Sequence, residues 1–459
     1  MTFTSSIFLI GVLPWFVIIF DWFVNRKGKV WTNKIFLFLA NSVFLIWGGM
    51  GSFLMLCAYT IIIWLLSLLI IMFSNRWILA ISLILATLPL VLIKYTVFIL
   101  QIINTIIGCD IRISNILVPI GISFITFEAI SLLVDIYRGR IDKCPSLLCT
   151  YLYLTFFPTV TSGPILRYKD FGDGLQNPDF MMRHADSIQL IAKGLCKKVL
   201  IADKIAILAD YYFNGVAAGN SYSSTGLWIG SIAYTLQLYF DFSGYSDMAI
   251  GIGRLLGFNI RKNFNRPYDA VSISDFWKRW HISLTQWFRD YVYIPLGGNR
   301  CSVTRHLFNM FIVWLLTGIW HGADWSFIIW GLGYYVLLVA EKYIPVMKKV
   351  SHGIIGHIYT MFFVNLLWVF FRAKNLSIAI SYLRGMFFIS GQIEEKAIRF
   401  MPFLIVTIFI CFPWSKMASG FFDKKGAVFV KKIAFVVVVI LALCAVVNSS
   451  YAPYIYGNF

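Results

Sequence analysis

Charge is scarce in this sequence. Charged residues make up 13% of the 459 residues, whereas hydrophobic residues make up 59% and aromatic residues 18%. Soluble domains carry roughly 25% charged residues. Apolar runs recur along the whole chain, each near the roughly 20 residues that a helix needs to cross a bilayer, and the alternation typical of β-barrels is not seen. The composition predicts an all-α, polytopic integral membrane protein and excludes a soluble enzyme.

The run lengths predict roughly 10–12 transmembrane helices, with re-entrant and interfacial helices among them. No internal repeat and no soluble domain is visible, so residues 1–459 are expected to form a single transmembrane domain. A transporter or flippase would show inverted repeats or paired broken helices, and neither pattern is visible.

Acidic residues are also few, with 21 against 39 basic ones and a net charge of +18. The basic residues cluster in loops at Arg26–Lys34, Arg138–Lys143 and Asp423–Lys432, as the positive-inside rule requires of cytoplasmic segments. This places both termini outside the cytoplasm and predicts an even number of crossings. No basic solvated domain exists, so we expect no nucleic-acid partner. A basic cytoplasmic face would attract anionic lipid head groups and anionic cofactors.

Several kinds of catalytic motif are missing. The eight cysteines show no two-residue spacing, which argues against zinc and redox pairs. No G-x-S-x-G elbow supplies a serine nucleophile for a covalent acyl-enzyme. No His-x-x-His or His-Glu spacing appears, so no metal site is expected.

Histidine is the remaining candidate for catalysis. Only six are present, and two directly follow tryptophans, at Trp280-His281 and Trp320-His321. His321 lies between two apolar runs, at or near membrane depth, where a polar group is a functional candidate. Imidazole titrates near neutrality and can act as a general base. Asp324 could orient this ring if the segment is helical. A purely structural role for His321, bonded to a neighbouring carbonyl, remains open.

The residues around His281 show helical periodicity. Spacings of three, four, seven and eleven residues from Trp277 predict one aromatic helix face that includes His281. The residues on this face are Trp277, Trp280, His281, Leu284 and Phe288. Arg289 and Asp290 follow, and Gly297-Gly298 predicts a turn before Asn299.

Other polar stretches interrupt the apolar runs. Glu128 is interpreted as a carboxylate paired with a neighbouring Arg or Lys, or as a functional group lining a cavity. Thr159–Tyr168 is expected to be irregular, and Lys169–Asp186, with His184, to be a loop. Ile188–Tyr212 is predicted to be one amphipathic helix on the cytoplasmic surface, because its lysines share a face.

Two further runs contain helix-disturbing residues. Pro89 is expected to kink the run before Lys94. Gly244 is expected to break the helix Leu227–Ile252; in an uninterrupted helix Asp241 and Asp247 would face roughly opposite sides.

The stretch Phe276–Arg300 and the tripeptide Trp320-His321-Gly322 resemble the membrane-bound O-acyltransferase (MBOAT) family, in particular its bacterial alginate and peptidoglycan O-acetyltransferase branch. Further segments of the chain that resemble this branch are Pro119–Phe124, Ser162–Tyr168, Asp241–Asp247, Trp368–Ala373 and the aromatic tail ending in Phe459.

This resemblance implies a ring of transmembrane helices around a funnel with a tunnelled floor. It places His321 at the family's near-invariant histidine and His281 at a second catalytic position. The other candidates for the substrate tunnel are Trp280, Trp320, Arg289, Asp290, Asn299 and Asp324.

The resemblance also implies a reaction. Acetyl-CoA would serve as acyl donor on the cytoplasmic side of a bacterial inner membrane, with no cofactor bound permanently. The acetyl group would pass to an extracytoplasmic, serine-esterase-like transferase partner that acetylates a polysaccharide. D-alanyl transfer to teichoic acid, by a related branch, is the alternative within the family.

Overall fold

A computed structural model describes residues 7–15, 18–20, 30–111, 113, 118–178, 184–388, 390–411 and 425–448. Every regular element in these ranges is helical, which confirms the all-α prediction. The elements of the first half are η1 (Ile7–Val12), α2 (Val30–Trp47), α3 (Met50–Phe73), α4 (Arg76–Leu90), η2 (Val91–Tyr95), α5 (Thr96–Ile107), α6 (Ile122–Tyr137), α7 (Leu147–Leu154), α8 (Tyr168–Gln176), α9 (His184–Cys196), η3 (Lys197–Ala202) and α10 (Asp203–Ala217). Those of the second half are α11 (Ser224–Leu255), η4 (Pro267–Asp269), α12 (Ile273–Arg279), α13 (Ile282–Phe288), η5 (Arg289–Tyr293), α14 (Val303–His321), α15 (Trp325–Tyr343), α16 (Pro345–Val350), α17 (Gly353–Arg372), α18 (Leu376–Phe388), α19 (Glu395–Cys411) and α22 (Lys425–Asn448).

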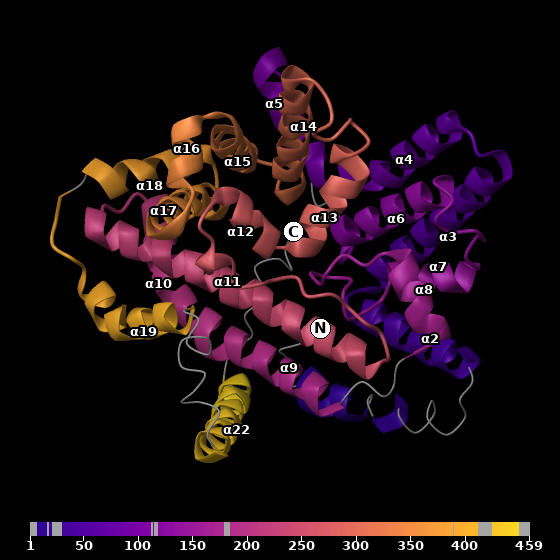
Figure 1. The fold of residues 1–459 in the computed structure, drawn as a ribbon, viewed down its shortest axis with the longest axis horizontal. Coiled ribbons are helices and arrows are strands. Elements are labelled where there is room, and N and C mark those ends of the chain that lie inside the picture. The colour runs from indigo at the N-terminus through magenta and orange to yellow at the C-terminus, as the bar shows by residue number, and fades with distance from the viewer. Residues whose placement is uncertain are drawn as a thin grey trace.

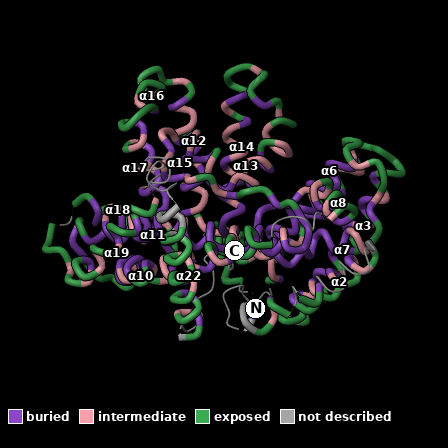
Figure 2. Tube along the Cα trace, turned by 60° about the horizontal axis from the view of Figure 1, so that its bottom comes forward, coloured by how far each residue is buried: buried purple, intermediate pink, exposed green. Residues whose placement is uncertain are grey.

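Helices from the beginning of the chain and helices from its end lie on opposite sides of a shared centre. In Figure 1, α2, α3 and α6–α8 lie on one side, α10 and α16–α19 lie on the other, and α12 and α13 lie between them. The long helix α11 crosses the middle beside α9. Buried residues concentrate toward the centre, whereas the outer helices expose residues on their outward faces (Figure 2). The residues that carry the histidine motifs therefore occupy the interior of the molecule.

Helix α11 is continuous, so the break expected at Gly244 is wrong. Ser223 starts the helix, because its hydroxyl accepts a hydrogen bond from the Gly226 N–H at 3.0 Å. Gly244 serves helix packing instead: a Cβ there would lie 2.8 Å from the carbonyl oxygen of Gly194 on α9. Small residues of this kind let membrane helices approach closely.

The stretch Ile188–Tyr212 is helical throughout, but its lysines do not share one exposed face, which corrects the basic face predicted for it. It is divided among α9, the π-helical η3 and α10, and Lys198 is buried. The Lys198 ammonium lies 2.7 Å from carboxylate oxygens of both Asp203 and Asp241, and Lys197 lies 2.6 Å from Asp247. Both α11 carboxylates thus face η3 and pair with consecutive lysines, rather than pointing to opposite sides.

The polar stretch Lys169–Asp186 is also more regular than predicted. It contains most of α8 and the start of α9 at His184, so the loop assignment is wrong for these parts. The irregular backbone expected at Thr159–Tyr168 is confirmed, because turns and extended residues separate α7 from α8. Gly121 allows this segment to approach α6, since a Cβ there would lie 2.1 Å from the Val160 carbonyl oxygen.

Three helices in the described ranges are long and apolar enough to cross a membrane, namely Met50–Phe73, Arg76–Ile107 and Gly353–Arg372. Shorter apolar helices lie at Trp31–Trp47, Leu376–Phe388 and Lys432–Val447. The total of 10–12 crossings and the single-domain assignment stay predictions. The aromatic tail after residue 448 lies outside the described residues.

Candidate functional site

His281 and His321 meet at one aromatic cage. His281 has no exposed surface and His321 is 2% exposed. The Trp320 ring adjoins both, with centroids 6.4 Å from His281 and 4.5 Å from His321. An apolar enclosure favours the neutral imidazole, which is the form that can accept a proton.

Each imidazole also has aromatic neighbours of its own. Phe242 of α11 lies edge-on to His281 at 4.7 Å between centroids. Trp330 of α15 and Phe371 of α17 lie 4.8 and 5.1 Å from His321. Segments far apart in the sequence therefore enclose the two rings.

The backbone turns sharply at His281, so the single aromatic helix face predicted around it is wrong. Helix α12 ends at Arg279, Trp280 is extended, and His281 is left-handed, with φ 43° and ψ 55°, before α13 begins. A left-handed conformation in a residue other than glycine costs of order 1–3 kcal/mol and persists only where the surroundings hold it. The turn separates His281 from the helical register of Trp277.

Asn263 holds this turn. Its backbone carbonyl accepts the Ile282 N–H at 2.9 Å. Its side-chain Oδ1 accepts hydrogen bonds from the Ser283 N–H at 3.1 Å and the Ser283 hydroxyl at 2.9 Å. The same oxygen lies 3.3 Å from His281 Nδ1.

These contacts define the tautomer of His281. Because a backbone N–H of Ser283 donates to Asn263 Oδ1, this atom is the amide oxygen, and Nδ1 of His281 must be the protonated nitrogen that donates to it. The acceptor nitrogen of neutral His281 is then Nε2. Sequence reasoning missed Asn263, although its place in the basic, irregular stretch before Pro267 was visible.

His321 is the last residue of α14, which changes the role expected for Asp324. Gly322 is extended, so the helix does not continue to Asp324. Asp324 instead begins α15, where its carboxylate accepts the Ser326 N–H at 2.8 Å. The condition for Asp324 to orient His321 along one helix is therefore not met.

Trp280 packs on the opposite side of the turn from α13. It is 1% exposed, and its ring lies 5.1 Å from Trp368 and 5.5 Å from Phe276. Trp280 and His281 share Phe242 as a neighbour, at 6.4 and 4.7 Å. Trp280 thus packs against Phe242, which in turn contacts His281.

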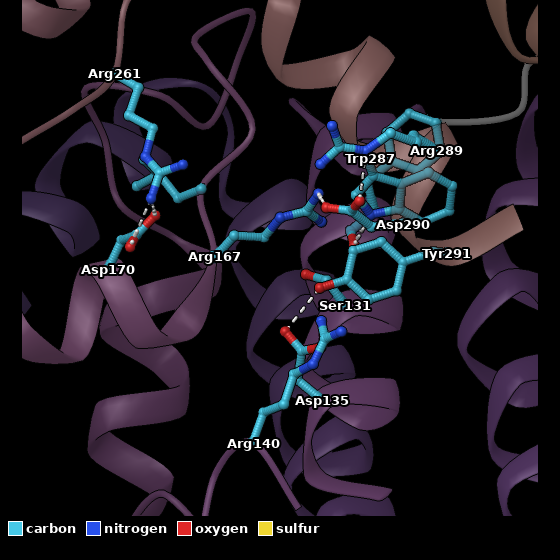
Figure 3. A network of polar contacts seen from close by, with 12 residues as sticks. Ser131, Asp135, Arg140, Arg167, Asp170, Arg261, Trp287, Arg289, Asp290 and Tyr291 are labelled. Carbon is cyan, nitrogen blue, oxygen red and sulfur yellow. Dashed lines mark hydrogen bonds and ion pairs between the residues drawn. The ribbon is translucent and has the colours of Figure 1, made fainter. Parts of the chain in front are cut away.

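Arg289 and Asp290 line a polar cavity of about 380 Å³. The Arg167 guanidinium stacks on the Tyr291 ring at 4.3 Å and lies 3.6 Å from the Asp290 carboxylate. Figure 3 shows Arg167 reaching toward Asp290, with Arg261 and Arg289 on either side. The cavity is lined by six cationic side chains, at Arg140, Arg167, Lys169, Arg261, Lys262 and Arg289, and by three carboxylates, at Asp135, Asp170 and Asp290. This excess of cations suits an anionic ligand.

A second cavity, of about 420 Å³, shares Ile282, Gln286 and Arg289 with the basic one. It is lined mainly by apolar groups and includes Trp277 of α12 and Thr317, one turn before His321. The two cavities therefore adjoin each other at α13, and neither is lined by His281 or His321.

Asn299 and Glu128 occupy different settings. Asn299 is exposed, directly after the predicted Gly297-Gly298 turn, in which both glycines have positive φ. Glu128 is 2% exposed and accepts the Leu166 N–H at 3.2 Å. Its cationic neighbour is Arg167, from an irregular segment rather than a neighbouring helix. Glu128 therefore anchors that segment against α6.

Comparison with known proteins identifies the chain. The family model described as "MBOAT, membrane-bound O-acyltransferase family" matches residues 137–382, which include both histidines and Asn263. The chain belongs to the membrane-bound O-acyltransferase family. It is therefore an O-acyltransferase and a polytopic membrane protein, as the sequence motifs predicted.

Three relatives show the range of this similarity. The chain is 37% identical over 409 residues to "Probable alginate O-acetylase AlgI" of Pseudomonas aeruginosa, covering 86% of this chain and 76% of the relative. It is 32% identical over 420 residues to "Peptidoglycan O-acetyltransferase" of Helicobacter pylori, covering 80% and 79%. It is 31% identical over 248 residues to "Teichoic acid D-alanyltransferase" of Bacillus subtilis, covering 51% and 62%. The two O-acetylating relatives thus match a larger share of the chain than the D-alanyltransferase does.

Proposed function

We propose that this MBOAT protein takes an acetyl group from acetyl-CoA on the cytoplasmic side of a bacterial inner membrane and passes it across for O-acetylation of an extracytoplasmic polysaccharide such as alginate or peptidoglycan. The observation that carries the proposal is the pair of buried imidazoles that share Trp320. The extensive similarity to O-acetylating relatives supports acetyl as the transferred group.

His321 is the general base in this proposal. Its imidazole removes the proton from an acceptor hydroxyl while the hydroxyl oxygen attacks the thioester carbonyl carbon. The new C–O bond forms as the C–S bond breaks, and the thiolate of CoA leaves and takes up a proton. No covalent acyl-enzyme is required, which agrees with the lack of a serine elbow in the sequence.

The basic cavity supports a phosphate-bearing donor. CoA carries phosphate groups, and guanidinium groups bind phosphate with paired, charge-assisted hydrogen bonds. The cavity adjoins the end of α6, whose Arg138 donates to the Asp290 carbonyl at 3.1 Å. The basic loop that starts at Arg138 was predicted to be cytoplasmic, so the donor would enter from that side. The apolar cavity beyond Arg289 would take the pantetheine arm toward the histidines.

The acceptor side is proposed from the resemblance. An extracytoplasmic, serine-esterase-like partner would receive the acetyl group and transfer it to the polysaccharide, while both termini of this chain lie outside the cytoplasm. Membrane lipids surround the outer helices, whose exposed apolar residues suit a bilayer.

Transfer of labelled acetyl groups from acetyl-CoA tests the proposal, in membranes that contain wild type or His321→Ala. Loss of a general base lowers the rate by roughly 10²–10⁴-fold, so we expect His321→Ala to lose transfer by at least about 100-fold. His184→Ala, at the start of α9, is the matched control and should retain transfer. Equal accumulation of all three proteins is checked first.

Each other outcome has a definite meaning. Wild-type rates in His321→Ala would assign His321 a structural role and move the proton-acceptor role to His281. Failure of wild type to use acetyl-CoA, combined with transfer from a D-alanyl thioester, would assign the chain to the D-alanyl reaction instead.

A further inference from the structure

A lysine lies in the middle of an apolar membrane helix, and the proposed reaction does not explain it. Lys94 belongs to the span Arg76–Ile107. It is thirteen residues from the nearer end of the span, about 20 Å along the axis. Ionisable groups at such depth are costly and usually have a defined partner.

The helix that contains Lys94 departs from α-helical geometry around this residue. Pro89 has no N–H, so it interrupts the α-helical hydrogen bonding, and the chain continues as the π-helix η2 from Val91 to Tyr95 before returning to α-helix. Short π-helical turns within α-helices occur frequently at functional sites. A π-helical turn thus follows directly after the helix in which Pro89 was expected to cause a kink, and both Lys94 and Tyr95 belong to this turn.

Both side chains donate to the end of α14. Lys94 Nζ lies 2.6 Å from the Trp320 carbonyl oxygen, and the Tyr95 hydroxyl lies 2.8 Å from the Ile319 carbonyl oxygen. The last four carbonyls of a helix have no partner within the helix. Since Gly322 is extended, α14 does not end in the left-handed glycine motif that usually satisfies them. Donors from η2 replace that motif.

We propose that Lys94 is a positioning residue for His321: its ammonium group fixes the C-terminal turn of α14 and so holds the imidazole in the aromatic cage. This proposal rests on the proposed function, in which His321 is the general base. Lys94 acts through the Trp320 peptide, to whose carbonyl it donates, one residue from His321.

The charge of Lys94 is part of the role. A cation interacts favourably with the negative end of the helix dipole at a C-terminus, and hydrogen bonds from an ionised donor are shorter and roughly twice as strong as neutral ones. Arginine would keep this charge, glutamine would keep only a neutral donor, and methionine would keep neither. The three substitutions therefore separate charge from hydrogen bonding and from bulk.

Steady-state acetyl transfer by Lys94→Met, Lys94→Gln and Lys94→Arg tests the proposal. We expect Lys94→Met to lower kcat about tenfold or more, because a group moved from its productive position loses effective molarity. The KM for acetyl-CoA should change less than about twofold, since ground-state binding is untouched. Lys94→Arg should recover most of kcat, with Lys94→Gln between the two.

Tyr59→Phe is the matched control. The Tyr59 hydroxyl donates to the Ala86 carbonyl at 2.8 Å, a buried bond between α3 and α4 that does not involve α14. Tyr95→Phe removes the equivalent bond to Ile319. The two tyrosine variants should lower Tm to a similar extent, whereas only Tyr95→Phe should lower kcat.

A readout independent of activity is amide hydrogen exchange of the peptide that contains residues 317–322. Exchange there should be faster in Lys94→Met and Lys94→Gln than in wild type, and it should return toward wild type in Lys94→Arg. Should Lys94→Met fail to accumulate, Lys94→Gln and Tyr95→Phe test the same end of α14.

The outcomes separate the two proposals. Wild-type kcat and exchange in Lys94→Met, while His321→Ala is inactive, would overturn the positioning role alone. A rise in KM without a fall in kcat would overturn it as well. Wild-type activity in His321→Ala would overturn the proposed function, and the exchange experiment would still report whether Lys94 holds α14.

Discussion

Removal of the Asn263 side chain is expected to disable His281 without removing it. Asn263→Ala deletes the oxygen that accepts from the Ser283 N–H, the Ser283 hydroxyl and His281 Nδ1. A typical buried hydrogen bond contributes about 1 kcal/mol, so the turn would lose up to about 3 kcal/mol. That loss is comparable to the 1–3 kcal/mol typically stored in a left-handed residue such as His281.

The expected result is loss of both the conformation and the tautomer of His281. If His281 takes part in proton transfer or in binding of the acceptor, acetyl transfer should fall by about 100-fold, the lower end of the range for acid–base groups. Asn263→Asp keeps an oxygen acceptor of the same reach and should retain more transfer than Asn263→Ala.

Asn309→Ala is the matched control. Asn309 is also buried, and its amide donates to the Gly298 carbonyl at 3.0 Å, at the far end of α14 from His321. Transfer from acetyl-CoA and Tm would be measured for each variant in the same detergent. Unchanged transfer in Asn263→Ala would refute the role of the Asn263 side chain, and an equal fall in Asn309→Ala would show general damage to the fold.

Two further predictions concern residues outside the cage. Arg261→Gln in the basic cavity should raise the KM for acetyl-CoA about twofold to fivefold, because an exposed charge contributes up to about 1 kcal/mol, yet leave S-acetylpantetheine, which lacks phosphates, unaffected. Arg399→Gln, on α19, is its control, and equal effects on both donors would contradict the phosphate assignment. Burial alone would raise the pKa of the Glu394 carboxyl, but hydrogen bonds led by the Ser223 N–H outweigh burial and lower this pKa below its usual value. Its stabilising effect is therefore present above the usual carboxyl pKa and lost as the pH falls through the lowered one. Glu394→Gln should flatten the fall in Tm between pH 6 and pH 3, and the same flattening in exposed Glu395→Gln would contradict the assignment.

The apolar runs predicted the membrane helices closely, because each helix is defined by its own residues. The apolar sequence from Phe53 to Phe73 coincides with α3 to within three residues, and that from Ile354 to Phe371 coincides with α17 to within one at each end. Local signals of this kind need no knowledge of the rest of the chain.

The features of the site that were wrong or missed depend instead on partners far along the chain. The turn at His281 contains neither glycine nor proline, and it is held by Asn263, eighteen residues earlier. The spacing of Lys198 in the sequence is that of a surface lysine. In the structure Lys198 is buried, and its ammonium group pairs with the Asp241 carboxylate on the next long helix. Periodicity assumes that a segment continues undisturbed, so it cannot reveal either arrangement.

The two histidines are therefore held by separate supports, and the Trp320 ring adjoins both imidazoles. Asn263 fixes His281 from the segment before α12, and Lys94 with Tyr95 fixes the end of α14 from a membrane helix near the N-terminus. The two supports come from different parts of the chain, so the separation of the two imidazoles depends on how these parts pack around Trp320. A reaction that requires reacting atoms to be positioned to within a fraction of an ångström would be sensitive to buried hydrogen bonds at both supports. It would be far less sensitive to exchanges among apolar residues on the outward faces of α3 or α17, where lipid replaces protein as the neighbour.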